Sequence, residues 1–178
     1  MGLIVSSQSM KQKIYQIDAF ASKVFTGNPA AVCILEDWLA DDLMQSIAEE
    51  NNLAETAFAI KNGEQYGLRW FTPETEVDLC GHATLATAFV LFEYYGHASD
   101  TIVFFSQRSG QLTVEKIADG LLCMDFPIDA LEEKQHIPEI NEAIGEIPLK
   151  TFKGKTDYML VFTSQEVIEG LKPNFFLL

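Results

Sequence analysis

The chain has 178 residues and a formal net charge of −14, a length sufficient for one large domain or two small ones with a hydrophobic core. Hydrophobic residues at 48% and charged residues at 21% are typical of a globular protein. The acidic balance argues against nucleic acid or an anionic membrane as a partner, because both attract basic patches. Cys33, Cys80 and Cys123 are widely spaced, which fits neither a zinc motif nor a disulfide framework and favours a cytoplasmic location.

The first third of the chain alternates strand-like runs with turns and one amphipathic helix. Gly27, Asn28 and Pro29 form a turn signal between the first two runs, and Asn62 with Gly63 predicts a hairpin turn between the last two. The helix is predicted over residues 37–50, with Trp38, Leu39, Leu43, Met44 and Ile47 on its apolar side. Strands are predicted at residues 13–20, 30–35, 53–60 and 66–71.

The segment from residue 78 to Gly96 predicts a buried central helix over about 82–95. Residues 83–92 carry no charge, and apolar or small side chains fall on every face, which is the pattern of a helix surrounded by protein. This helix is too short to cross a bilayer. Asp78, Cys80 and His82 gather at its N-terminal end, where unpaired backbone N–H groups and the helix dipole favour an anion.

Three further strand-like runs follow, at residues 101–106, 111–117 and 121–126. We therefore predict an α+β fold whose first half, residues 10–127, is a mostly antiparallel, barrel-like sheet around the central helix. Residues 128–178 predict the start of a second half, which is incomplete. They contain a polar linker at 131–134, short helices at Pro138–Ile144 and 167–171, and one strand at 158–162.

Several motifs together carry a family resemblance. The most specific are the Gly27-Asn28-Pro29 loop, the Glu55-Thr56 strand and the helix start at Cys80, Gly81 and His82. In their order and spacing the motifs resemble the phenazine-biosynthesis (PhzF-like) isomerases, which are relatives of diaminopimelate epimerase. The matching segments are 17–20, 25–32, 52–58, 68–73, 76–85 and 157–161.

This resemblance implies a fold of two similar halves, each a barrel-like sheet around a helix, with the active site in the cleft between them. Characterised members use no cofactor, and they move a proton along a small cyclic carboxylic acid or carry out related isomerisations. We expect no metal in this chain. The family's second half normally contributes a histidine-bearing helix start of its own, which has no counterpart in these 178 residues. We therefore expect the isolated chain to turn over slowly, if at all, unless a homodimer completes the site.

Glu55 is the candidate general acid/base, because desolvation in an apolar pocket raises the pKa of a carboxyl group from about 4.3 toward neutrality. Without the resemblance, a surface glutamate at a strand end is the favoured alternative. His82 is the second candidate catalytic residue, because it could assist the proton transfer or donate to a substrate carboxylate, while the backbone N–H groups of Gly81 and His82 hold that anion. The alternative for His82 is a histidine that caps its own helix or is hydrogen-bonded in the core.

The remaining candidates keep two interpretations each. Asp78 either orients His82 or is a solvent-facing acid, and Asn28 either contacts the substrate or only shapes a turn. The epimerase relatives place a catalytic cysteine at the position of Cys80. Because Cys33 and Cys123 lie in first-half strands and cannot supply the second thiol of a two-base racemase, we expect Cys80 to be a small buried residue.

The sequence thus predicts a cytoplasmic, cofactor-independent isomerase that acts on a small, cyclic, carboxylated metabolite. The alternative is a catalytically inactive, truncated paralogue that serves as a binding or interaction module. In that case the apolar tail at residues 175–178 is expected to bury against a partner.

Overall fold

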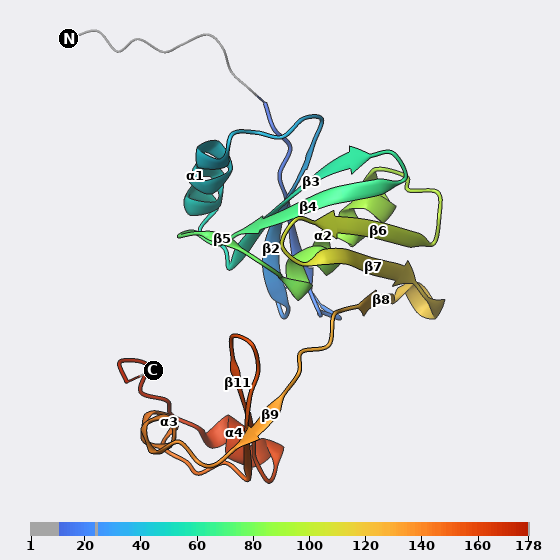
Figure 1. Ribbon diagram of the computed structural model, residues 1–178. Coiled ribbons are helices and arrows are strands. Elements are labelled where there is room, and N and C mark those ends of the chain that lie inside the picture. The colour runs from blue at the N-terminus through green and yellow to red at the C-terminus, as the bar shows by residue number, and fades with distance from the viewer. Residues whose placement is uncertain (1–10, 24, 178) are drawn as a thin grey trace, which may run out of the picture. The chain divides into compact units, whose positions relative to one another are not determined.

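The computed structural model describes residues 11–23 and 25–177, which divide into two compact units (Figure 1). The first unit ends at Phe126 and the second begins at Pro127. The N-terminal boundary expected at residue 10 lies outside the described residues, as does Leu178 at the end of the apolar tail.

The first unit is built on an eight-stranded sheet in the order β1-β2-β3-β4-β6-β7-β8, with β5 attached to β4. Neighbouring strands are antiparallel except for two parallel pairs, β2 with β3 and β4 with β6. The sheet is therefore mostly antiparallel, as the sequence predicts. The strands are β1 Tyr15–Ala19, β2 Asn28–Leu35, β3 Glu55–Asn62, β4 Gln65–Phe71, β5 Glu76–Val77, β6 Thr101–Ser106, β7 Gly110–Lys116 and β8 Leu122–Asp125; a short 3-10 turn, Ala118–Gly120, joins the last two.

The predicted central helix is α2, Gly81–Tyr94, and it lies in the curve of the sheet (Figure 1). It differs from the predicted bounds by one residue at each end. Small side chains fill its first turns, which lets the surrounding strands approach closely. The residues of α2 that are fully or almost fully buried are His82, Ala83, Thr84, Ala86, Thr87, Ala88, Val90, Leu91 and Phe92.

Helix α1, Asp41–Asn51, packs on the other face of the sheet through Met44 and Ala48, in a second, smaller core. The prediction that this helix starts at residue 37 is wrong. Its first turn instead begins with Asp41 and Asp42, whose charges are favourable at a helix N-terminus, and Trp38 stays outside the helix and 41% exposed.

The second unit contains more strand than the sequence indicates. Its sheet has the order β11-β10-β9 and is antiparallel, and Glu132–Lys134, expected as linker, forms β9 because it pairs with Lys153–Thr151 of β10. The short helix at Pro138–Ile144 is confirmed. The elements are β9 Glu132–Lys134, α3 Pro138–Ile144, β10 Lys150–Lys153, β11 Tyr158–Val161 and α4 Gln165–Gly170.

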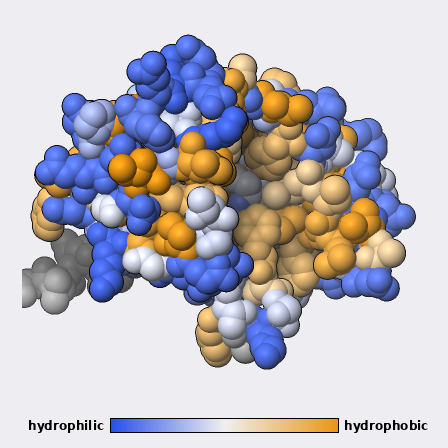
Figure 2. Space-filling view, turned by 90° about the horizontal axis from the view of Figure 1, so that it is seen from below, coloured by the Kyte–Doolittle hydropathy of each residue, from blue (hydrophilic) through white to orange (hydrophobic). Residues whose placement is uncertain are grey.

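Hydrophilic and hydrophobic residues are interspersed on the face shown in Figure 2. Among the described residues of the apolar tail, Phe176 is fully exposed, Phe175 is 79% exposed and Leu177 is about half exposed. Of the helices that the structure describes, none is both long enough and apolar enough to span a membrane.

Candidate active site

Glu55 is the first residue of β3, and the alternation of the strand directs its side chain to the face that carries α2. Ala57 and Ala59, two and four residues further on, belong to the core around α2, whereas Phe58 belongs to the core around α1. The parallel pairing of β2 with β3 places Glu55 beside Ala30. The Glu55 side chain is only 19% exposed, so it is not a solvent-facing glutamate at a strand end.

His82 is the second residue of α2, and its side chain is 9% exposed. The helix starts after Cys80, whose extended backbone ends the connection from β5. The backbone carbonyl of Cys80 accepts hydrogen bonds from the backbone N–H of Thr84, at 3.2 Å, and from its hydroxyl, at 2.6 Å. These bonds fix the first turn, and the turn in turn fixes where the imidazole of His82 lies.

The imidazole of His82 lies between a carboxylate and a thiol. Its Nε2 is 3.1 Å from Oε2 of Glu55, and its Nδ1 is 3.4 Å from Sγ of Cys80. The ring N–H does not point along the line to the carboxylate, so within residues 11–23 and 25–177 neither Nε2 nor Oε2 has an aligned hydrogen-bond partner, although both atoms are buried. Buried polar atoms without a partner are uncommon in proteins, and a catalytic role is one of the accepted explanations for them.

Burial raises the pKa of the Cys80 thiol to about 12, and the adjacent Glu55 carboxylate acts in the same direction. The backbone N–H groups of Ala83 and His82 oppose this shift of the Cys80 pKa. A protonated thiol donates its hydrogen to Nδ1, which leaves the ring hydrogen of a neutral His82 on Nε2, facing Glu55. The buried position expected for Cys80 is confirmed, but the sequence analysis missed its contact with His82, which the spacing of two residues across a helix start could have suggested.

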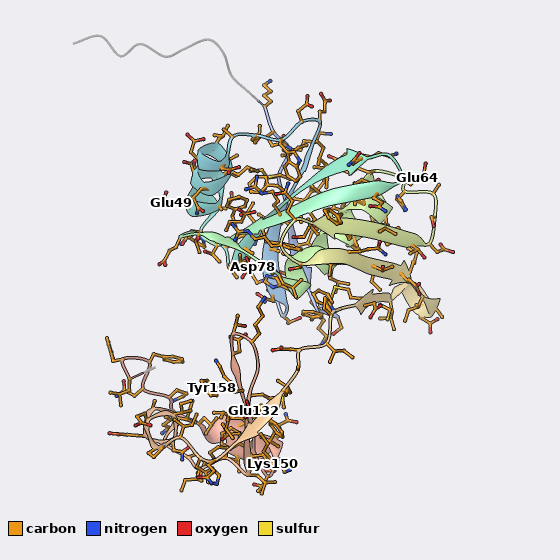
Figure 3. The ribbon with its side chains drawn as sticks, viewed as in Figure 1. Glu49, Glu64, Asp78, Glu132, Lys150 and Tyr158 are labelled. Atoms are coloured by element: carbon orange, nitrogen blue, oxygen red, sulfur yellow. The ribbon has the colours of Figure 1, made fainter. Side chains whose placement is uncertain are left out.

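Asp78 does not orient His82. Its carboxylate is 66% exposed and accepts a hydrogen bond of 2.9 Å from Arg108, and the Ser109 hydroxyl donates to its backbone carbonyl. Arg108 also contacts the carboxylate of Glu76, at 3.0 Å. Asp78 therefore anchors the connection between β5 and α2, where Figure 3 shows it.

Asn28 opens β2 rather than lying in a loop, so the predicted turn ends at Gly27. Asn28 pairs with Ala19 across the β1–β2 ladder, and its side chain is exposed. It lies two residues before Ala30, the neighbour of Glu55, so alternation places it on the same face and at the same end of the sheet. The structure therefore brings Glu55, Gly81 and His82 together and leaves Asn28 at the rim.

The sequence profile of the phenazine biosynthesis-like protein family matches residues 17–176. The chain belongs to this family. The resemblance carried by the motifs is therefore confirmed.

Other members of the phenazine biosynthesis-like family show how far the similarity extends. An uncharacterized isomerase of Pseudomonas aeruginosa is 47% identical over 167 residues, which are 93% of this chain and 63% of that protein. A human phenazine biosynthesis-like domain-containing protein is 46% identical in an alignment of 182 positions, which covers 93% of this chain and 62% of the human protein. The chain thus spans less than two thirds of the length of these relatives.

Solved structures of the phenazine biosynthesis-like family share the fold. The crystal structure of a PhzF-family protein from Enterococcus faecalis is 49% identical, with a TM-score of 0.86 over 95% of this chain and 64% of that one. A predicted epimerase of Pseudomonas aeruginosa, only 20% identical over 92% of this chain and 63% of that one, still superposes with a TM-score of 0.70 and shows the fold alone. The predicted α+β, diaminopimelate epimerase-like fold is therefore confirmed.

Proposed function

We propose that the protein is a cofactor-independent isomerase that moves a proton on a small, cyclic carboxylic acid. The observation that carries this proposal is the pair Glu55 and His82, buried together at the N-terminal tip of α2 with their facing polar atoms 3.1 Å apart. The names of the relatives support an isomerase, since two of those from Pseudomonas aeruginosa are called isomerases.

In the proposed reaction, one carboxylate oxygen of Glu55 removes a proton from a carbon of the substrate. The electron pair of that C–H bond enters the conjugated system next to the substrate carboxylate. The proton on the Glu55 carboxyl group exchanges with solvent, and Glu55 then delivers a proton to a carbon two atoms away. No atom is gained or lost. Holding both the base and the substrate in place accounts for much of the rate enhancement of such a step.

The tip of α2 would bind the substrate carboxylate. The backbone N–H groups of Gly81 and His82 belong to the first helical turn, where backbone donors lack partners within the helix and the dipole is positive. The unaligned Nε2–H of His82 is a further donor. We expect slow turnover by the 178 residues alone, because the family's second histidine-bearing helix start has no counterpart in them.

The test is hydrogen exchange at carbon in heavy water, with a panel of small unsaturated cyclic carboxylic acids at high protein concentration, followed by mass spectrometry. We expect deuterium to enter at least one acid, and Glu55→Gln to abolish the exchange, because an amide cannot accept the proton. Cys123→Ser, which removes an exposed thiol, is the matched control and keeps the full rate.

Cys80→Ser separates the carboxylate from the thiol as the base. A neutral hydrogen bond contributes about 0.5–1.5 kcal/mol, so losing the thiol contact slows a carboxylate-based exchange by no more than about tenfold. Exchange that survives Glu55→Gln, or that disappears with Cys80→Ser, would contradict the proposal.

The alternative function is an interaction module without catalysis, and the exposed Phe175 and Phe176 favour it. It predicts no exchange with any acid of the panel. It also predicts that the chain associates with itself or binds a partner, and that Phe176→Ser weakens this association. Sedimentation of the unsubstituted chain and of the Phe176→Ser variant over a concentration series measures self-association. The same experiment tests the homodimer expected from the sequence.

A further inference from the structure

Three different metal-ligating side chains meet at the tip of α2. One ligand atom each from Glu55, Cys80 and His82 lies within 4.8 Å of the other two. Two of these residues flank the start of α2 and the third comes from β3, so the cluster is held by the tertiary packing of helix and sheet. Carboxylate oxygen, imidazole nitrogen and thiolate sulfur are together a donor set that suits Zn²⁺ and does not suit Mg²⁺ or Ca²⁺.

We propose that Glu55, Cys80 and His82 form a binding site for a zinc-like divalent cation, and that the bound cation blocks the isomerase reaction. The binding is independent of the proposed function, whereas the inhibition rests on it, because the cation would occupy the oxygen of Glu55 that takes the proton.

Two observations beyond the ligand types support the site. The buried Nε2 of His82 and Oε2 of Glu55 have no aligned partner within the described part of the chain. Oε2 can therefore coordinate an ion directly, and Nε2 can do so once the ring hydrogen moves to Nδ1, which a Cys80 thiolate no longer needs as an acceptor. The side chain of His82 is also nine-tenths buried, which shields a bound ion from water.

The distance between Glu55 and His82 is close to that of two ligands in a tetrahedral zinc site. Bonds of about 2.0–2.3 Å to nitrogen, oxygen and sulfur at tetrahedral angles put neighbouring ligand atoms about 3.3–3.6 Å apart. The distance of 3.1 Å between Oε2 of Glu55 and Nε2 of His82 is near this range, whereas the 3.4 Å contact of Cys80 is to the other ring nitrogen, Nδ1. Only one imidazole nitrogen binds the ion, so Cys80 must rotate about its side-chain bond to complete the set.

Three protein ligands leave the fourth position of a tetrahedral ion open for water or for a substrate carboxylate. Binding displaces the proton of the Cys80 thiol into solvent, because a coordinated cysteine is a thiolate. The affinity should therefore rise with pH.

The test uses Co²⁺ as a spectroscopic substitute for Zn²⁺, added to the full chain under reducing, oxygen-free conditions without chelating buffers. We expect a near-ultraviolet sulfur-to-cobalt charge-transfer band together with visible bands of four-coordinate cobalt, saturating at one equivalent. One equivalent of Zn²⁺ should abolish these bands by displacement. Proton release on binding, measured with an indicator dye, gives a second readout.

The variants decide which residues bind the ion. Cys80→Ser should remove the charge-transfer band, and Glu55→Gln should weaken binding at least tenfold, while Cys123→Ser, which removes an exposed thiol, should leave the spectrum unchanged. Circular dichroism confirms that each variant is folded. A band that survives Cys80→Ser, a band lost with Cys123→Ser, or no band in the unsubstituted chain overturns the proposal.

The failure of this proposal can be told apart from failure of the proposed function. The cobalt spectrum needs no substrate, and carbon exchange in the presence of a metal chelator needs no cation. If the spectrum is as expected and Zn²⁺ fails to inhibit the exchange, the site exists but does not block the reaction, and the inhibition is refuted.

Discussion

The buried thiol of Cys33 makes the stability of the first unit depend on pH in a way that can be calculated. Cys33 lies in β2 and is completely buried, and desolvation raises the pKa of its thiol from 9.0 to about 12. In the unfolded chain this thiol returns to its ordinary pKa. Above pH 9 the unfolded state therefore binds fewer protons than the folded state, so the free energy of unfolding falls as pH rises from about 9 toward 12.

Between pH 8 and pH 10 the loss from this one thiol is about 1.4 kcal/mol, because one pH unit above the unfolded pKa corresponds to 1.36 kcal/mol. Cys33→Ala removes this contribution. The variant is less stable at every pH, because the smaller side chain leaves space in a packed core. From pH 8 to pH 10, however, its free energy of unfolding should decrease less than that of the unsubstituted chain, by about 1.4 kcal/mol.

The assay is urea unfolding followed by circular dichroism at pH 8 and pH 10 with a reducing agent present. Other titrating groups contribute nearly equally to both chains and so largely cancel in the difference, including Tyr95, whose pKa is raised mainly by burial and least by Cys33. Cys123→Ser, which removes a thiol that is exposed to solvent in both states, is the control and should follow the unsubstituted chain. Equal losses for Cys33→Ala and the unsubstituted chain would refute the reasoning.

Three other predictions follow from the packing and the charges. A thiol-reactive dye at pH 8 should label Cys123 quickly and the buried Cys33 and Cys80 only on unfolding. A thiol with a pKa of about 12 is ionised to only about one part in ten thousand at that pH. Fast labelling of two thiols would contradict this prediction. Gly27→Ala should lower the free energy of unfolding of the first unit in urea by about 1–3 kcal/mol, because a Cβ there would clash with the backbone carbonyl of Ala19. Gly170→Ala is the control: a Cβ at Gly170 meets no atom within 4 Å, so the midpoint of urea unfolding should change little. Arg108→Met should lower the stability by no more than about 1 kcal/mol, because its ion pairs are partly exposed; a larger loss in the same assay would mean that the pairs are worth more than surface pairs usually are.

The central helix could be predicted because its evidence is local. Ten uncharged residues with no polar face admit only a buried helix, and the structure places α2 within one residue of the predicted bounds. The hairpin turn at Gly63 was equally local, since its positive φ suits glycine.

Elements that depend on pairing with distant residues were harder to predict. The three residues of β9 are polar and exposed, so no hydrophobic alternation marks them, and only the register with β10 makes them a strand. Asparagine before proline is typical of a turn, yet Asn28 pairs with Ala19 of β1 and is therefore the first residue of β2. Trp38 fits the apolar side of a helix, but the two aspartates that follow it start the helix later.

Some residues of the candidate site could be predicted from the sequence, and the roles of others depend on neighbours that are distant in the sequence. Glu55 and His82 were singled out through the family resemblance, because no spacing rule links a strand residue to a helix residue across an intervening hairpin. The contact of Cys80 with His82 was missed because Cys80 was judged only as a partner for a second thiol. The role expected for Asp78 depended on neighbours that sequence does not reveal, and Arg108 occupies its carboxylate instead.

The small side chains between α2 and the sheet have a consequence for partly denatured states. Glu55 and His82 meet only while alanines such as Ala57 and Ala83 hold the helix against the strands. A loosened, molten-globule-like form would retain its far-ultraviolet circular dichroism while the two side chains drift apart. Mild acid or a low concentration of denaturant should therefore abolish activity at the site before the secondary structure is lost.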